Sequence, residues 1–168
     1  VWSLSILTPD HTYISAGEFG PVLQQPSSIA LDRNGRIWIG SRAQRNVVIL
    51  NPDGSEAHFS PLTHGLDNRD SLITFGEIGG LAYAPKDIMC VASDTASSNI
   101  FRFHTQTGEP LRGIDLDYGI SSIDCDRQGH LFALENSSTR FHVLTPTGLD
   151  LMGSPFGLSH TANDIAVT

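Results

Sequence analysis

The chain has 168 residues, of which 39% are hydrophobic and 17% charged, and its formal net charge is −8. This length allows a sizeable core, and 16 Gly with 9 Pro favour many short elements separated by turns over long charged helices. A protein that binds nucleic acid by neutralising phosphates needs a basic face, and an acidic chain is repelled by an anionic membrane. We therefore expect neither nucleic acid nor a membrane as its partner.

The sequence begins at Val1 without the basic-then-apolar pattern of a signal peptide, and no apolar run approaches the ~20 residues that cross a bilayer. We expect either that processing has removed the start of the protein or that the chain is an excised piece. Cys90 and Cys125 lack metal-ligand spacing; we interpret them as two buried thiols, with one disulfide between neighbouring strands as the alternative. The sequon Asn136-Ser137-Ser138 and the scarcity of lysine favour a secreted or periplasmic location.

Four segments in chain order repeat one pattern, in which small residues lead into an apolar run, a polar turn and a second apolar run. Ile29, Leu81, Ile123 and Ile165 occupy equivalent positions, 52, 42 and 42 residues apart. The first interval contains extra polar sequence at residues 63–70, which we interpret as an insertion in one connection. Periods of about 40 to 50 residues are typical of propeller blades.

Each repeat continues with another apolar run and a tight turn. Short runs rich in Ile, Val, Leu and Phe are typical of strands, and Pro-Asp-Gly or Thr-Gly supplies the turn. We therefore expect four antiparallel strands per repeat, A to D. The matching second halves are residues 47–54, 100–108 and 141–148, with the same piece at residues 4–11.

Such four-stranded sheets bury both apolar faces when they stack radially around an axis, which predicts an all-β fold, a β-propeller. Two-residue periodicity excludes a helical solenoid, and an immunoglobulin-like sandwich would not repeat one four-strand motif. The predicted single domain comprises residues 1–24 (strands C and D of one blade), the blades 25–77, 78–118 and 119–160, and residues 161–168 (strand A of the next blade).

The segment from Gln25 to Asp32, followed by residues 34–39 and 47–54, resembles an NHL repeat. A Pro and small residues lead into strand A, an Asp precedes the Gly turn, and Trp38 lies in strand B. The upstream residues 17–20 are similar to the linker of that family. The second repeat departs most, because Ala84 and Asp87 stand where Asp and Gly are expected. The resemblance implies about six blades, whereas this chain carries about four repeats and three complete blades, an incomplete ring.

Three explanations of the incomplete ring stay open. The chain is a fragment of a longer protein, or its ring is completed by another copy or another chain, or it closes as a compact four-bladed ring. Three blades with open ends expose unpaired strand edges. We therefore expect a protein partner or self-association through these edges, with a small-molecule ligand as a further option.

The connections from strand D to the next strand A, and from B to C, share one face around the channel of a propeller. Oxygen-rich side chains there suit Ca²⁺ or another divalent cation, although solvated surface carboxylates are the simpler interpretation, and we expect no cofactor. The residues predicted for this binding face are Glu18, His64, Glu77, Asp94, Asp117, Glu135 and His160, with Ser41, Asp67, Asp70, Asp115, Asn136, Asn163 and Asp164 beside them.

The segment His160-Thr161-Ala162-Asn163-Asp164 resembles the Asn-Asp segment of regucalcin- and gluconolactonase-like propellers. The resemblance implies a metal held by Asn163, Asp164 and Glu18, with Asp164 as the catalytic base. NHL-like lyases instead hold zinc with histidines. Here only His64 and His160 are expected to converge, one short of a three-histidine site. The histidines predicted to lie away from this face are His58, His104, His130 and His142.

No nucleophile elbow, phosphate-binding glycine loop or paired-cysteine motif occurs in the sequence. We therefore expect a non-enzymatic binding or assembly scaffold that uses the channel face or the open strand edges. The alternative is a metal-dependent lactonase-like hydrolase. The hydrolase needs a tightly held divalent ion at Asn163 and Asp164, and the scaffold does not.

Overall fold

The computed structural model describes residues 2–7, 13–19, 24–94 and 100–167, with side chains described from residue 24 onward. These ranges form antiparallel strands and no helix, as the sequence predicts. Consequently, nothing in the described chain has the helical length and apolarity needed to cross a membrane.

Three sheets form the blades, each running outward in chain order. Blade 1 has three strands, and residues 56–62 take its fourth position through the bridges Leu50↔Glu56 and Val47↔Leu62. Blades 2 and 3 have four strands each. The bounds are β3 (Pro26–Leu31), β4 (Ile37–Ser41) and β5 (Asn46–Leu50); β8 (Glu77–Ala84), β9 (Ile88–Asp94), β10 (Ile100–His104) and β11 (Pro110–Ile114); β12 (Ile120–Cys125), β13 (Leu131–Glu135), β14 (Arg140–Leu144) and β15 (Phe156–Gly157).

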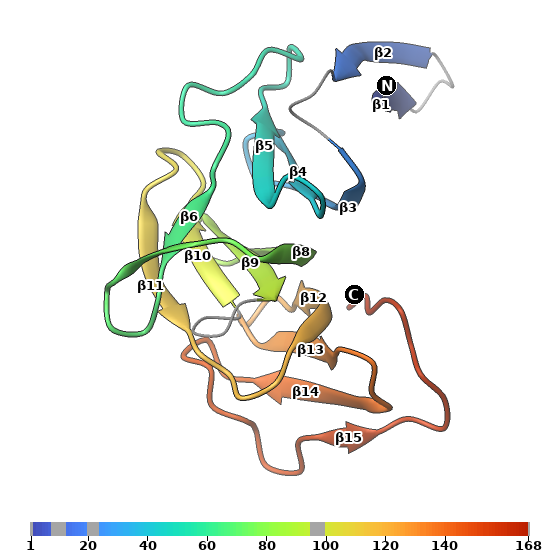
Figure 1. Cartoon of the computed structure of the whole chain (residues 1–168), viewed down its shortest axis with the longest axis vertical. Coiled ribbons are helices and arrows are strands. Elements are labelled where there is room, and N and C mark those ends of the chain that lie inside the picture. The colour runs from blue at the N-terminus through green and yellow to red at the C-terminus, as the bar shows by residue number, and fades with distance from the viewer. Residues whose placement is uncertain (1, 8–12, 20–23, 95–99, 168) are drawn as a thin grey trace.

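The blades follow one another along an arc (Figure 1), with the first strand of each, β3, β8 and β12, on its inner side. The apolar side chains of adjacent blades interdigitate. Between blades 1 and 2, Phe75 packs against Phe101 with ring centroids 4.9 Å apart, and Trp38 and Phe103 are fully buried. Between blades 2 and 3, the core contains Ile100, Ile114, Leu131 and Leu144 among others. This face-to-face burial is the stabilisation that radial stacking provides.

The turn between the first two strands differs between blades. In blade 1, Asp32 Oδ1 accepts the amides of Asn34 and Arg36, and in blade 3, Asp126 Oδ1 accepts those of Gln128 and His130. Blade 2 has Ala84 at the equivalent position. There the chain turns through Lys86 and Asp87 at φ values of 66° and 59°, and the Tyr83 hydroxyl donates to Asp87 Oδ1 at 2.8 Å.

The insertion after blade 1 is an ordered hairpin of β6 (His64–Leu66) and β7 (Leu72–Thr74), where the sequence predicts only a polar loop. It packs on the outer strands of blade 2. A Cβ on Gly65 would lie 2.3 Å from the Phe101 ring, and Gly113 N donates to Asp67 O at 3.2 Å. Tertiary contact with blade 2 therefore stabilises strands too short for their pattern to be recognised.

The two ends of the described chain differ in secondary structure. β1 (Trp2–Leu7) and β2 (Tyr13–Phe19) form a two-stranded antiparallel sheet. Residues 161–167, predicted as strand A of a further blade, have no assigned strand. They follow β12 through side-chain bonds, because Ile165 N donates to Ser122 Oγ at 3.4 Å and Val167 N to Asp124 Oδ2 at 2.7 Å.

Candidate functional site

The same irregularity begins the inner strand of every blade. The pairing with the second strand shifts between Pro26 and Ser28, between Ile78 and Gly80, and between Ile120 and Ser122. Each shift is a β-bulge, which re-aims a side chain and is frequent at the rims of barrels and near binding sites. The bulged residues are Ser27, Gly79 and Ser121, and the repeat assigns Asn163 to the same position.

Small residues at and after the bulges join neighbouring inner strands. The Ser27 hydroxyl donates to Ile78 O at 2.7 Å, and the Ser28 hydroxyl accepts from Leu81 N at 2.9 Å. Ser122 repeats this role, since its hydroxyl donates to Asp164 Oδ1 at 2.6 Å. The bonds of Ser27 and Ser28 satisfy the backbone groups Ile78 O and Leu81 N.

A cavity of about 510 Å³ lies where these inner strands meet, and we call it the channel cavity. Its walls combine serine hydroxyls, a carboxamide, two carboxylates, one guanidinium and four isoleucine or leucine side chains. Pockets of 300–1,000 Å³ with a few convergent polar groups are typical of small-molecule sites. The lining residues are Ser27, Ser28, Ile29, Arg42, Gly79, Leu81, Ser121, Ser122, Ile123, Asp124, Asn163, Asp164 and Ile165.

The carboxylates of the channel cavity hold the fold together. Asp124 accepts Cys125 N at 2.8 Å and Val167 N at 2.7 Å. Asp164 Oδ1 accepts the Ser122 hydroxyl and Ile165 N, at 2.6 and 2.9 Å. Arg42 is held loosely, with its Nε 3.6 Å from Glu77 Oε2 and both side chains about half exposed. The guanidinium is thus the charged group that a ligand reorganises most easily.

Several predicted face residues lie at or near the channel cavity. Asn163 and Asp164 line it, and Glu77 pairs with Arg42 on its wall. Asp94 stands opposite Glu77 in the pairing of β8 with β9. Glu18 lies in β2, and its side chain is outside the described residues.

The two histidines expected to converge do not share the channel cavity. His64 lies in the inserted hairpin and bonds to the Thr63 hydroxyl at 2.7 Å, and His160 bonds to the Ser159 hydroxyl at 3.0 Å. Both are exposed, and neither lines the cavity.

A second cavity, of about 310 Å³, contains two other predicted residues, and we call it the outer cavity. It lies between the β11–β12 connection and the strands β13 and β14. The lining residues are Asp117, Tyr118, Glu135, Arg140, His142, Asp150 and Pro155. His142, which the sequence predicts to lie away from the channel face, thus shares this cavity with Asp117 and Glu135, two residues predicted for that face.

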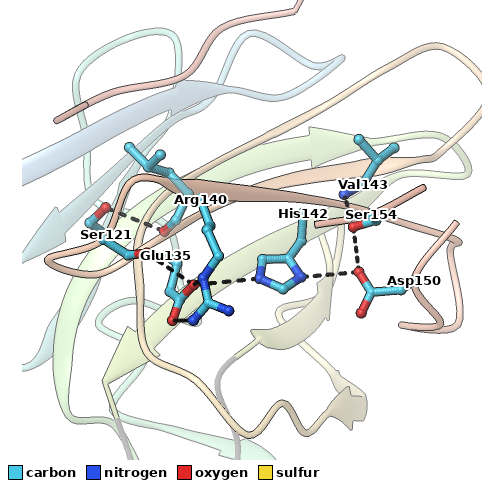
Figure 2. Close-up of polar contacts among 9 residues, drawn as sticks. Ser121, Glu135, Arg140, His142, Val143, Asp150 and Ser154 are labelled. Atoms are coloured by element: carbon cyan, nitrogen blue, oxygen red, sulfur yellow. Dashed lines mark hydrogen bonds and ion pairs between the residues drawn. The ribbon is translucent and has the colours of Figure 1, made fainter. Parts of the chain in front are cut away.

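His142 is the centre of this cluster (Figure 2), and it is only 4% exposed. Its Nδ1 lies 3.0 Å from Asp150 Oδ1, and its ring stacks on Tyr118 with centroids 3.8 Å apart. Its Nε2 lies 3.8 Å from Glu135 Oε2, beyond hydrogen-bond distance, and Arg140 Nε binds the same oxygen at 2.7 Å.

The outer cavity also shifts two pKa values. Burial raises the pKa of Tyr118, and the nearby carboxylates Asp150, Asp117 and Glu135 raise it further, so its hydroxyl stays protonated. Desolvation raises the pKa of Asp150, but its bonds with the Ser154 hydroxyl and His142 outweigh this and hold that pKa below its usual range. Asp150 is therefore ionised at neutral pH and accepts the proton on His142 Nδ1.

The metal site that the sequence resemblance implies includes Glu18, whose side chain lies outside the described residues. Among them no three His, Cys, Asp or Glu side chains are grouped to hold a metal ion. Asn163 and Asp164 are adjacent, but Asp164 Oδ1 is occupied by hydrogen bonds. Cys90 and Cys125 are free, and burial raises the pKa of each to about 12, so neither is a thiolate at neutral pH.

Comparison with known proteins supports the fold. A family described as a two-component regulator propeller matches residues 23–43. No curated protein sequence matches the chain.

Three solved structures are similar over most of this chain. A protein described as a putative gluconolactonase has a TM-score of 0.66 and 19% identity, covering 94% of this chain and 57% of its own. A gluconolactonase from Xanthomonas campestris has a TM-score of 0.65 and 19% identity, covering 95% and 57%. A catalytically inactive virginiamycin B lyase from Staphylococcus aureus, crystallised with quinupristin, has a TM-score of 0.63 and 12% identity, covering 94% and 49%.

The chain thus spans about half the length of these structures, and identities this low establish the fold alone. The comparisons support a propeller without singling out NHL repeats. The chain has the fold of a β-propeller, and its described residues form an incomplete ring of four-stranded antiparallel blades around the channel cavity.

Proposed function

We propose that this protein is a non-enzymatic binding module that takes a small polar ligand in the channel cavity. The observation that carries the proposal is the convergence of four equivalent positions, Ser27, Gly79, Ser121 and Asn163, on one cavity of about 510 Å³. Hydroxyl and amide groups both donate and accept hydrogen bonds, and a volume of this size accommodates a small molecule. Arg42 adds one half-exposed cation at the wall.

The state of Asp164 favours binding over catalysis. Oδ1 of Asp164 accepts the Ser122 hydroxyl of β12 and the amide of Ile165 in its own segment. These two bonds fix the carboxylate, whereas a general base has to take up a proton from the substrate and release it again. A ligand can bind beside Asp164 without disturbing either bond.

The test is ligand-observed NMR with a panel of polyols, sugars and amino acids. Asn163→Trp fills the cavity, and Asn34→Trp places the same side chain in the exposed β3–β4 turn as a matched control. We expect a hit that binds the natural protein and the control but not Asn163→Trp. Hits that persist in Asn163→Trp, or a panel without hits, would refute the proposal.

The lactonase-like hydrolase is the second candidate, favoured by the presence of Asn163 and Asp164 in one cavity and by the two gluconolactonase structures of similar fold. Native mass spectrometry beside a denatured intact mass tests it. A stoichiometric divalent-ion adduct, together with lactone hydrolysis lost in Asp164→Asn, would replace the binding module with this enzyme.

Association through the inner strand of blade 1 is a further part of the proposal. Ile29 of β3 is 57% exposed, and Leu31 in the same strand is 62% exposed. The residues equivalent to Ile29 in the next two blades, Leu81 and Ile123, are 6% and 4% exposed because another blade covers them. We expect a protein surface to cover β3 similarly. Native mass spectrometry also measures the oligomeric state. A defined oligomer that is lost in the Ile29→Asp variant supports self-association through β3, and a monomer rejects it.

A further inference from the structure

A further cavity, of about 250 Å³, lies between blades 2 and 3, and we call it the inter-blade pocket. Its walls come from the β8–β9 turn, the β12–β13 turn and residues 146–147 after β14. Because antiparallel strands alternate in direction, these turns lie at the end of the blades opposite the channel face. The described residues that line the inter-blade pocket are all different from those of the channel cavity and the outer cavity.

The charge of the inter-blade pocket is opposite to that of the whole chain, whose net charge is −8. Its charged residues are Lys86 and Arg102, and none of the described residues that line it is acidic. The channel cavity and the outer cavity, by contrast, both contain carboxylates. The inter-blade pocket therefore favours an anionic ligand.

Arg102 is held in place by groups that do not neutralise it. Its Nε donates to Arg112 O at 2.7 Å, and its Nη1 reaches across to blade 3 and donates to Pro146 O at 3.2 Å. Both acceptors are backbone carbonyls, and the ion pairs found among the described residues do not include Arg102. A guanidinium has five N–H donors, so three of them remain for a ligand.

Lys86, the only lysine of the chain, supplies the second cation. It lies in the turn of blade 2 that replaces the Asp-led turn of the other blades, and its φ is 66°. The carboxylate of the next residue, Asp87, does not line the pocket and accepts the Tyr83 hydroxyl instead. Within the described part of the chain Lys86 has no ion pair, so its charge also stays available.

The inner wall of the pocket is apolar. It contains Ile88 together with Cys90 and Leu131, which are each only 2% exposed. Burial raises the pKa of the Cys90 thiol to about 12, so this side chain stays neutral beside an anion. Two cations next to an apolar wall suit a ligand that has an anionic end and a hydrocarbon end.

We propose that the inter-blade pocket binds a short-chain alkyl carboxylate. The carboxylate accepts N–H groups of Arg102 and Lys86, because the planar guanidinium matches the geometry of a carboxylate. The alkyl chain lies against Ile88, Cys90 and Leu131. The site is separate from the channel cavity and does not rest on the function proposed for it.

The experiment follows the backbone amides of Ile88 and Gly129 by NMR while hexanoate is added. Three controls each lack one property of hexanoate: 1-hexanol has no charge, n-hexylammonium has the opposite charge, and inorganic phosphate has no hydrocarbon chain. We expect saturable shifts with hexanoate and none with the controls. Equal shifts with phosphate or with 1-hexanol, or no shifts with hexanoate, would overturn the proposal.

A series of acetate, butyrate and hexanoate tests the apolar wall in the natural protein. Each methylene group that becomes buried should strengthen binding by about fourfold. An affinity that does not change with chain length would mean that the hydrocarbon stays in solvent, which contradicts the proposal.

Lys86→Gln tests the cation, because this exposed side chain can lose its charge without a change in the core. Arg127→Gln is the matched control, since it removes the same charge from the exposed β12–β13 turn, beside the pocket but outside its lining. We expect hexanoate to bind about fivefold more weakly to Lys86→Gln and equally well to Arg127→Gln, with unchanged circular dichroism spectra. Equal affinities of the two variants would refute a contact between Lys86 and the carboxylate.

Discussion

The contact between blades 1 and 2 and the contact between blades 2 and 3 join the same inner strands in different ways. From β3 to β8, the hydroxyls of Ser27 and Ser28 bond to Ile78 O and Leu81 N. From β8 to β12, Gly79 and Gly80 bring the backbones together directly. A Cβ on Gly79 would lie 2.6 Å from Ile120 O, and one on Gly80 would lie 2.8 Å from Ile123 N.

The comparison shows that the same contact between inner strands can be stabilised by serine hydroxyls or by glycines that have no side chain. A serine contact keeps the strands apart and depends on hydrogen bonds, each worth about 1 kcal/mol. A glycine contact depends on close approach, and any added atom meets backbone that cannot rotate away. Alanine should therefore weaken both contacts, for opposite reasons and by different amounts.

Gly80→Ala should have the largest effect. The new methyl group meets Ile123 N and the Ile123 side chain, so β8 and β12 must separate. We expect the free energy of unfolding to fall by about 3 kcal/mol, measured by urea denaturation. Gly157→Ala is the control, since a Cβ there has no neighbour within 4 Å. Equal stability of the two variants would show that the contact is not tight.

Ser28→Ala should cost about 1 kcal/mol, because the buried amide of Leu81 loses its acceptor while no atom is added. The same denaturation series measures it, with Ser71→Ala on the exposed hairpin as the control. A loss as large as that of Gly80→Ala would remove the distinction between the two contacts.

Ser122→Ala extends the comparison to the contact with residues 163–167. Its hydroxyl bonds to Asp164 Oδ1 and Ile165 N. Because this segment has no strand pairing of its own, we expect it to open locally while global stability changes by less than about 0.5 kcal/mol. Hydrogen exchange should accelerate at the Ile165 and Val167 amides and stay unchanged in β8–β11. Unchanged exchange at both amides would mean that the hydroxyl does not hold the segment.

Replacing Asp126 in the turn of blade 3 should have the smallest effect on stability, and this effect should appear only at acidic pH. Desolvation raises the pKa of Asp126, but hydrogen bonds from the His130 side chain and from the amides of His130 and Gln128 hold that pKa below its ordinary value. The stability it contributes is fully present above the unfolded pKa of about 3.9 and is lost as pH falls through the lower folded pKa. Asp126→Asn should lack this loss in denaturation series from pH 6 to pH 2.5, and identical pH profiles would refute the assignment.

The strands were predictable because local and tertiary preferences agree along most of the chain. Val47–Leu50 is buried in the structure, and so are Ile100, Phe101 and Phe103, as their composition suggests. The hairpin of β6 and β7 was not predictable, since each strand has three residues and its stability comes from packing on Phe101. Residues 161–167 carry the repeat pattern, but the structure assigns them no strand.

The sites were predictable only in part. The repeat places Asn163 on the channel face, and the structure gives it a place in the channel cavity. The bulges were missed, because a one-residue register shift leaves no trace in two-residue periodicity, although the paired small residues 27–28, 79–80 and 121–122 are its signal. His142 was missed because alternation identifies it as a strand residue but cannot show that Tyr118 and Asp150 close around it.

Because of the repeated bulge, the bulged residues that line the cavity are not among the residues that pair the strands and pack the core of the blades. Ser27, Gly79, Ser121 and Asn163 belong to four different repeats and all line the cavity, the first three of them at a backbone register shift. Evolution or an engineer can therefore exchange one wall residue at a time, subject only to the space at that contact. The ligand selectivity of the cavity can therefore change through these wall residues while the core packing between the blades stays the same.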